Sequence, residues 1–394
     1  MITEPQQGLE GVVAATTRLS RVDGLAGRLT IAGYEVEELA PRATVEEVAH
    51  LLWYGSLPNA QELDALRADL AARRCPPAAT LALLREAAKR ASPVMDALRM
   101  AASTLSLGRN GSVEDDARTL VATFPAIVGA YWRLLHGQDP VEPRADLSHA
   151  ESCLHQIVGT EIGPERARAI ETYLNTVCDH GLNASTFAAR VIVSTHSDLV
   201  SAITGAVGAL KGPLHGGAPG PALDMVMEIG RADRAEAVIR RKLARGERLM
   251  GFGHRVYRVR DPRADVLAMA AERFYATEGN RELYELARAV ETTAVRLLAE
   301  HKPDRPLNTN VEFYTALLLH GLGLPNDLFT PIFAVGRVLG WTAHCLEQLR
   351  EGRLIRPESA YIGPSGLRFQ PLDSRPMRAP RITGPSSSVR RERE

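Results

Sequence analysis

The sequence has few cysteines, and no pattern among them would bind metal or build a disulfide framework. The four are Cys75, Cys153, Cys178 and Cys345, and no two of them form a Cys-X-X-Cys motif. Scattered thiols of this kind are typical of a reducing compartment, and they exclude the class of small disulfide-stabilised secreted domains.

Long apolar runs are absent as well. No window approaches about eighteen uninterrupted apolar residues, the length that a membrane-spanning helix needs. The first residues, MITEPQQGLEGVV, lack the basic stretch followed by an apolar one that marks an export signal. We therefore expect a cytoplasmic protein that does not contact a membrane.

Neither sign of charge is in excess. Lys plus Arg number 47 and Asp plus Glu number 47, so the formal net charge is zero when histidine is neutral. A chain without a strong overall field is not expected to bind nucleic acid or an anionic membrane. An anionic substrate would have to be held by arginine and histidine side chains placed locally.

The alternating pattern of β-strands is nearly absent too, with 27–33 as the one short candidate. Helical periodicity dominates instead, and Thr44 with Glu47 predicts a capping box that opens a helix ending at Gly55. Further helices are predicted over 60–74, 78–91, 93–107, 113–136, 164–178, 184–210, 233–246, 262–277, 280–300, 310–320 and 330–351. The sequence therefore predicts an all-α protein.

The end of the chain, 364–394, differs in composition from the rest. It is rich in Pro, Ser and Arg and contains few large apolar residues. This composition predicts a disordered tail, with a basic tether for a partner as the alternative.

Three histidines lie in loops where chemistry could take place. His215 lies in Gly-Pro-Leu-His-Gly-Gly and His254 in Gly-Phe-Gly-His-Arg, so both have backbone freedom to approach a ligand. One such histidine is more often a structural residue, but two in similar surroundings favour a site. His180 is ambiguous, because Asn183 could simply cap the next helix. No metal-ligand spacing such as HExxH is present.

Arginines cluster after the second of these histidines, at Arg255, Arg258, Arg260 and Arg263. A forked guanidinium binds a carboxylate or phosphate through two hydrogen bonds, although any one of these arginines could equally be part of a solvated turn. Arg337 differs because it lies among apolar residues in PIFAVGRVLGWTAH. A buried arginine needs a partner, which makes it the better candidate.

A possible carboxylate base lies in NTNVEFYTALLL. Asn308, Thr309 or Asn310 could cap this helix, which places Glu312 in its first turn, where free amides favour the ionised form. An ordinary first-turn glutamate is the alternative. Histidines, arginines and a carboxylate together suit an anionic substrate with a carbonyl group.

These segments, in this order, resemble the citrate synthase family over about 8–364. The motifs that carry the resemblance, with the residue that each gives, are CDHGLNASTFAAR (His180), LKGPLHGGA (His215), GFGHRVYRVRDPRA (His254 and Arg263), NTNVEFYTALLL (Glu312), AVGRVLGWTAHCLEQ (Arg337) and RLIRPESAYIGP (Arg356).

The resemblance implies an all-α homodimer. A large helical domain would be formed by 1–216 and 326–363, and a smaller domain, 217–325, would close over the substrate. Arg356 would reach across the dimer into the other subunit's active site. The partners implied are the small molecules oxaloacetate and acyl-CoA, with no nucleic acid, membrane, metal or redox cofactor.

The resemblance also implies the role of each residue. Oxaloacetate would be held by His180, His254, Arg263 and Arg337, together with the partner subunit's Arg356. His254 would also polarise the ketone of oxaloacetate.

The remaining roles concern acyl-CoA. Glu312 would take a proton from the methyl carbon of acetyl-CoA while His215 donates a hydrogen bond to the thioester oxygen, and hydrolysis of citryl-CoA would follow. The CoA phosphates are assigned to Arg255, with Arg258 and Lys302 as competitors.

The chain departs from the family pattern at two places. Glu312 stands where the family usually has Asp, so either the backbone is set back to fit the longer side chain, which we favour, or the protein is a slow or repurposed relative. Pro219-Gly220 stands where the family usually has Asn-Glu, which alters the loop on the CoA side. Two alternatives stay open: a 2-methylcitrate synthase that uses propionyl-CoA, and a weak paralogue that binds oxaloacetate or CoA as a sensor or assembly partner.

Overall fold

The computed structural model describes residues 7–9, 11–108, 110–216, 219–254, 256–303 and 307–375. It confirms the all-α prediction, since helices account for most of the described chain. The helices are α1 (Val36–Leu39), α2 (Val45–Tyr54), α3 (Ala60–Ala72), α4 (Ala78–Lys89), α5 (Val94–Thr104), α6 (Val113–Leu135), α7 (His149–Val158), α8 (Pro164–Val177), α9 (Ala184–Val193), α10 (Leu199–Leu210), α11 (Pro219–Ile229), α12 (Ala235–Ala244), α13 (Pro262–Thr277), α14 (Arg281–His301), α15 (Val311–Gly321) and α16 (Phe329–Glu351).

The chain divides into two compact units, which we describe separately. One is formed by Met1–Val12 and Pro357–Glu394, and regular structure among its described residues is limited to short 3-10 helices at Gln7–Leu9 and Leu372–Ser374. The predicted disordered tail falls partly here, and its residues 376–394 lie outside the described residues. The other unit is Val13–Arg356, which contains the sixteen helices described above.

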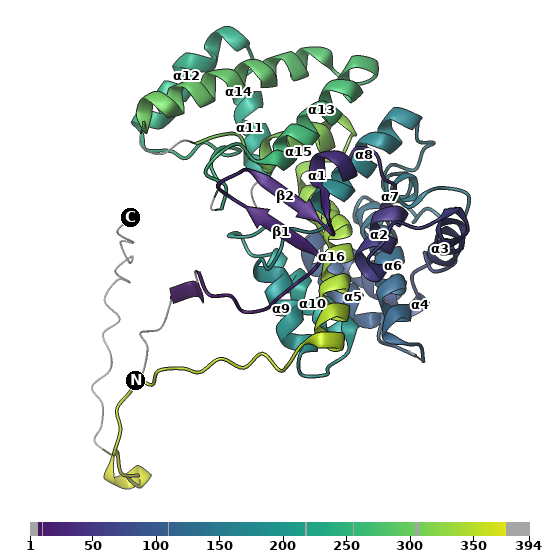
Figure 1. Ribbon diagram of the computed structural model, residues 1–394, viewed down its shortest axis with the longest axis vertical. Coiled ribbons are helices and arrows are strands. Elements are labelled where there is room, and N and C mark those ends of the chain that lie inside the picture. Colours follow the sequence, from purple (N-terminus) through teal and green to yellow (C-terminus); the bar gives the residue numbers. More distant parts are fainter. Residues whose placement is uncertain are drawn as a thin grey trace. The chain divides into compact units, whose positions relative to one another are not determined.

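Helix α16 lies at the centre of the larger unit, where it packs against α6, α8, α9 and α10 (Figure 1). Two glycines allow its close approach to α8. A Cβ on Gly336 would come within 2.9 Å of the Leu174 carbonyl oxygen, and one on Gly340 within 2.3 Å of the Cys178 carbonyl oxygen. The contact places Arg337, which lies between these glycines, against the C-terminal end of α8.

A three-stranded antiparallel sheet precedes the helices, with strands β1 (Ser20–Asp23), β2 (Arg28–Ile31) and β3 (Tyr34–Glu35) in that order. The strand expected within 27–33 is confirmed as β2. Strand β1, which was not expected from the sequence, pairs with it in a hairpin that sets Ser20 opposite Ile31 and Asp23 opposite Arg28.

In a second group of helices, α11 to α15, α13 packs against α15, α11 against α15 and α12 against α14, while α13 also packs against α8 (Figure 1). These helices fall in the stretch 217–325 for which a separate smaller domain is expected. The division into a large and a small domain stays a prediction.

Local signals located most helix ends correctly. The capping box at Thr44 is present, with its side chain accepting from the Glu47 N–H at 3.3 Å, and Gly55 ends the helix at φ 86°. The predicted helical run 184–210 was wrong as a single element. It is two helices, α9 and α10, because His196 adopts φ 61° and Asp198 caps a new helix through the Ser201 N–H.

Three helices, α1, α7 and α11, were not expected from the sequence. Helix α7 begins with a capping box of Ser148 and Glu151, the same signal that located α2. Among the described residues, no helix is long and apolar enough to cross a membrane.

Candidate active site

Two of the loops singled out in the sequence are hydrogen-bonded to each other just before helices α13 and α15. Phe252 and Thr309 form an isolated antiparallel bridge. The N–H of Gly253 donates to the carbonyl oxygen of Asn308 at 2.7 Å. This pairing holds the His254 loop against the residues that open α15.

The glycines before His254 are required by this geometry. Gly251 has φ 86° and Gly253 has φ 80°, both in the left-handed region. A Cβ on Gly251 would come within 3.0 Å of the Phe313 side chain, and one on Gly253 within 2.9 Å of Leu307. The backbone freedom inferred from the Gly-Phe-Gly-His motif is therefore used in full.

The ring of His254 is held in one tautomer. Its Nδ1 accepts hydrogen bonds from the N–H groups of Val256 at 3.0 Å and Tyr257 at 3.1 Å, so the proton of the neutral ring lies on Nε2. Burial, together with the positive charge of Arg263, lowers the pKa of His254 to about 4. Nε2 is 3.3 Å from Nη2 of Arg263. Two donors thus face the same space, where an oxygen acceptor would satisfy both.

Asp261 orients the Arg263 guanidinium. Its carboxylate accepts from Arg263 Nε at 3.1 Å and Nη2 at 2.9 Å, and also from the N–H of Val311 at 3.3 Å. Both members of the pair are buried. One carboxylate therefore fixes the arginine and ties it to the helix that carries Glu312.

Glu312 is the second residue of α15, and Asn310 is the cap, accepting the Glu312 N–H at 3.0 Å. In the described part of the chain its carboxylate has no hydrogen bond or ion pair. Burial raises the pKa of Glu312 to about 7, with the positive charge of Arg263 opposing the rise and the negative charge of Asp261 adding to it. A desolvated carboxyl group with a pKa near neutrality is suited to act as a general base.

His180 lies in the turn between α8 and α9. Its Nε2 is 3.1 Å from the Tyr257 hydroxyl, and its ring centroid is 5.8 Å from that of His254. Burial, together with the positive charges of Arg263 and Arg337, holds the pKa of His180 well below its ordinary value. The ring is therefore neutral and serves as a hydrogen-bonding group.

His215 is anchored by Ser185 at the start of α9. The Nε2 of His215 lies 2.7 Å from the Ser185 hydroxyl and 3.4 Å from its backbone N–H, while Trp341 donates to the same hydroxyl at 3.0 Å. The backbone donor favours Nε2 as an acceptor, which leaves the proton on Nδ1. Burial and the nearby charge of Arg337 lower the pKa of His215 to about 4, so the ring is neutral.

Arg337 is buried, with 1% of its surface exposed. Its Nε donates to the Val177 carbonyl at 2.6 Å, and its guanidinium lies 4.6 Å from the Phe333 ring centroid. No carboxylate of the described residues forms an ion pair with it. Desolvation lowers the pKa of Arg337 to about 10 although the negative charge of Asp179 opposes the change. A buried cation without an ion pair indicates a site for an anion.

The electrostatic influences show which candidates lie together. Arg337 lowers the pKa of His215 and His180, and Arg263 lowers the pKa of His180, His254 and Glu312. Six of the predicted residues therefore share one site: His180, His215, His254, Arg263, Glu312 and Arg337.

Of the other predicted residues, those that the structure describes do not join this site. Arg356 is exposed at the end of the larger unit and makes no hydrogen bond or ion pair within the described residues. Arg255, assigned to the CoA phosphates, lies outside the described residues. Arg258 and Lys302 are exposed. The loop before Pro219 also lies outside the described residues, at 217–218.

Arg260, counted among the possible substrate arginines, has a different task. Its guanidinium donates to the buried carboxylate of Glu291 at 2.7 Å. The hydroxyls of Thr309 and Tyr314 donate to the same carboxylate at 2.8 and 2.5 Å. Glu291 thus accepts hydrogen bonds from residues of both paired loops, a role that no local sequence signal indicates.

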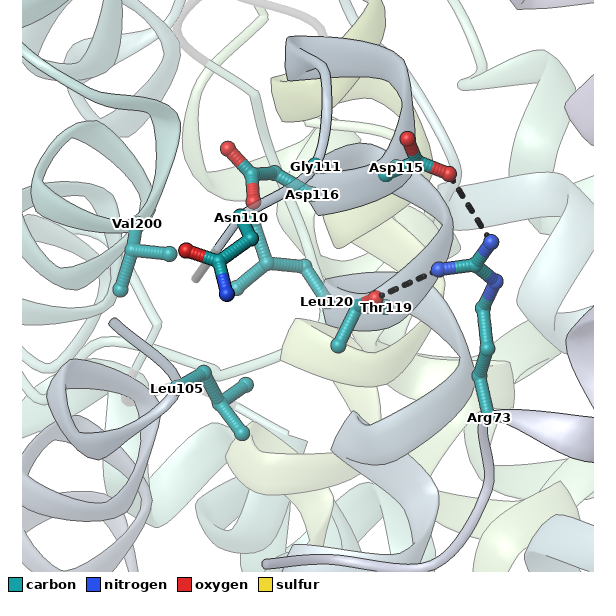
Figure 2. A pocket seen from close by; sticks show the side chains of 9 residues that line it. All are labelled: Arg73, Leu105, Asn110, Gly111, Asp115, Asp116, Thr119, Leu120 and Val200. Atoms are coloured by element: carbon teal, nitrogen blue, oxygen red, sulfur yellow. Dashed lines mark hydrogen bonds and ion pairs between the residues drawn. The ribbon is translucent and has the colours of Figure 1, made fainter. Parts of the chain in front are cut away.

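Neither a metal site nor the cavity at the start of α6 belongs to this group of residues. Within the described part of the chain, no three His, Cys, Asp or Glu side chains are grouped as a metal site requires. A cavity of about 190 Å³ lies at the start of α6 and is lined by none of the candidate residues (Figure 2). Its arginine, Arg73, is already paired with Asp115 at 2.9 Å and Thr119 at 3.2 Å.

The pKa values of the site predict how its activity depends on pH. Between pH 6 and 8 the histidines stay neutral, because their pKa values lie at about 4 for His215 and His254 and well below the ordinary value for His180. Only Glu312, with its pKa of about 7, changes charge, and a base must be ionised to take a proton. We expect kcat/KM to rise about tenfold from pH 6 to 8. A flat profile measured in this range would contradict the assignment.

Comparison with known proteins gives a consistent result. The family model described as citrate synthase, C-terminal domain, matches residues 8–358. A citrate synthase of Haloferax volcanii is 42% identical, covering 95% of this chain and 100% of the relative. A 2-methylcitrate synthase of Mycobacterium tuberculosis is 39% identical, covering 91% and 90%. The solved ternary complex of a Thermoplasma acidophilum citrate synthase with carboxymethyl coenzyme A and oxaloacetate matches with a TM-score of 0.85 and 32% identity, covering 94% and 100%.

Proposed function

The chain belongs to the citrate synthase family and is a transferase of that type, and we propose that it condenses acetyl-CoA with oxaloacetate and hydrolyses citryl-CoA to citrate and CoA. One observation carries the proposal. Two buried arginines, Arg263 and Arg337, lie around neutral histidines. The unpaired carboxyl group of Glu312 is close enough to Arg263 for that positive charge to lower its pKa. Such a site suits a dianionic keto acid beside a base.

The keto acid would take the place between the two arginines. Its carboxylates would satisfy the free donors of Arg337 and Arg263, and His180 would add a neutral hydrogen bond. The Nε2–H of His254 already points to a shared space with Arg263. It would donate there to the ketone oxygen and stabilise the negative charge that develops as the new carbon–carbon bond forms.

The thioester would be activated from the other side of the site. Glu312 would take the proton from the methyl carbon, and the Nδ1–H of His215 would stabilise the enolate oxygen. A neutral histidine suits this role because its Nδ1–H donates a hydrogen bond to the enolate oxygen while the ring keeps its proton and stays neutral. The backbone N–H of Ser185 favours that tautomer, because it donates to the opposite ring nitrogen.

The remaining expectations complete the proposal. We propose that 217–325 moves as a smaller domain to exclude water until the bond exists. A homodimer would bring Arg356 of the partner subunit to the oxaloacetate, since Arg356 of this chain is exposed. No metal or redox cofactor is proposed, because condensation followed by hydrolysis with one water is redox-neutral overall and the site's own donors would stabilise the negative charge that develops.

A second candidate function has one supporting observation, the 39% identity to a protein named 2-methylcitrate synthase. Propionyl-CoA differs from acetyl-CoA by one methylene, which is worth about 1–3 kcal/mol in a pocket. No described contact decides between the two thioesters. A binding paralogue is a third possibility, which rests only on glutamate at position 312.

The proposed function predicts oxaloacetate-dependent release of CoA. The purified full chain would be mixed with oxaloacetate and either acetyl-CoA or propionyl-CoA, and the new thiol followed with time. Runs without oxaloacetate correct for the protein's own exposed thiol at Cys75. We expect release with both, faster with acetyl-CoA; a faster reaction with propionyl-CoA would select the second function. No release with either would contradict both.

A further inference from the structure

The hairpin of β1 and β2 contacts two of the loops that carry candidate residues, and the proposed mechanism does not use these contacts. Ser20, the first residue of β1, forms hydrogen bonds with the residues on both sides of His180. The Ser20 hydroxyl donates to a carboxylate oxygen of Asp179 at 2.5 Å and accepts the N–H of Gly181 at 2.8 Å. One hydroxyl group therefore brackets His180.

The tip of the same hairpin contacts the residues on both sides of Tyr257, in the loop that carries His254. The N–H of Arg258 donates to the Gly24 carbonyl at 2.8 Å. A Cβ on Gly24 would come within 2.3 Å of the carbonyl oxygen of Val256, so only glycine fits here. Gly27 lies as close to Val259 at the next position, where a Cβ would come within 2.6 Å of a methyl group.

His180 and Tyr257, whose sequence neighbours the hairpin holds, contact each other. The Tyr257 hydroxyl lies 3.1 Å from Nε2 of His180, the histidine proposed to bind oxaloacetate. Tyr257 also packs beside His254, with ring centroids 4.8 Å apart, and its ring lies 5.9 Å from the Arg263 guanidinium. Any shift between the two loops would therefore change the oxaloacetate side of the site.

Among the described residues, Ser20 shares the support of Asp179 with a second side chain. The other is His344 on α16, whose Nε2 lies 3.2 Å from the carboxylate, with both side chains fully buried. Arg190 donates to the opposite ring nitrogen of His344 at 3.0 Å, which leaves the proton on the nitrogen that faces Asp179. The α16 support holds Asp179 alone, whereas Ser20 also holds Gly181 and belongs to the hairpin that reaches Tyr257.

We infer that Ser20 and Gly24 are positioning residues for oxaloacetate, setting the distance between His180 and Tyr257 through the hairpin. The inference rests on the proposed function for the identity of the ligand. It concerns a part of the chain far in sequence from every candidate residue. A hairpin that only stabilised the fold would affect both substrates equally, whereas a positioning hairpin affects the one that His180 binds.

The test is steady-state kinetics of full-length Ser20→Ala and Gly24→Ala, with each substrate varied while the other is saturating. We expect KM for oxaloacetate to rise between about tenfold and a hundredfold, the cost of a small misplacement, while KM for acyl-CoA stays within about twofold. Ser20→Thr keeps the hydroxyl and should recover most of the wild-type KM. Matched controls are Ser103→Ala, at an exposed helical serine, and Gly208→Ala, where a Cβ would have its closest contact at 3.7 Å.

A double substitution makes the test specific to the pair. If Gly24 acts through Tyr257, adding Gly24→Ala to Tyr257→Phe should raise KM for oxaloacetate by less than it does in the wild type. Equal rises in both substrates' KM, or full additivity, would overturn the inference. Failure of the wild type to release CoA would instead count against the proposed function, and the two outcomes are therefore distinguishable. Melting temperatures of every variant identify any that fail to fold.

Discussion

Replacing Glu312 with alanine is expected to lower kcat by about 10²–10⁴-fold, the usual contribution of a positioned general base. The carboxylate is unpaired among the described residues and its pKa is about 7, whereas the neighbouring carboxylate of Asp261 is held by hydrogen bonds from Arg263. Oxaloacetate binding should survive, since its proposed partners are the arginines and histidines. Isothermal titration with oxaloacetate and thiol release, both on the full chain, measure the two effects separately.

Two further substitutions at this position sharpen the test. Glu312→Gln keeps the shape and should be as inactive as alanine, which separates the role of the base from packing. Glu312→Asp withdraws the carboxylate by about 1 Å, and a loss of about a hundredfold would show that the site is built for glutamate. A gain of activity in Glu312→Asp would instead identify a relative whose glutamate weakened the site. Unchanged kcat in Glu312→Gln would rule out this residue as the base.

Much of the fold could be predicted because helix ends carry local signals. Thr44 with Glu47, and Gly55 ten residues of helix later, specify both ends of α2 through their own side chains or backbone. The run 184–210 misled the prediction because apolar periodicity continues across the break. The turn there depends on His196 adopting a left-handed conformation, which sequence disfavours and only the surrounding structure can impose.

The candidate site divides in the same way. Its histidines, arginines and glutamate lie in glycine-rich or apolar surroundings that are visible along the chain. The residues that support them are not visible along the chain in this way, because each acts through a contact with a residue far away in sequence. Ser20 reaches Asp179, and Ser185 reaches His215. Tyr257 lies within a quoted motif, yet only its distance to His180 reveals a use for its hydroxyl.

Replacing Arg337 with methionine is expected to weaken oxaloacetate binding by about 30-fold or more, since truncating one side of a buried charge pair costs about 2–5 kcal/mol. The effect should appear in the KM for oxaloacetate and in isothermal titration, with a smaller effect on the KM for acyl-CoA. Arg337→Lys should recover little, because an ammonium group lacks the planar fork that holds the Val177 carbonyl and a carboxylate together.

The stability of the same variant separates a binding role from a structural one. In the unliganded protein Arg337 is a buried cation whose pKa has fallen to about 10 because desolvation disfavours its charge. Methionine fills similar space without that cost, so the melting temperature should stay the same or rise while oxaloacetate affinity falls. Arg85→Met, at an exposed arginine of α4, is the matched control and should change neither. A variant that melts earlier and still binds oxaloacetate normally would show that Arg337 holds the helices together, and not the substrate.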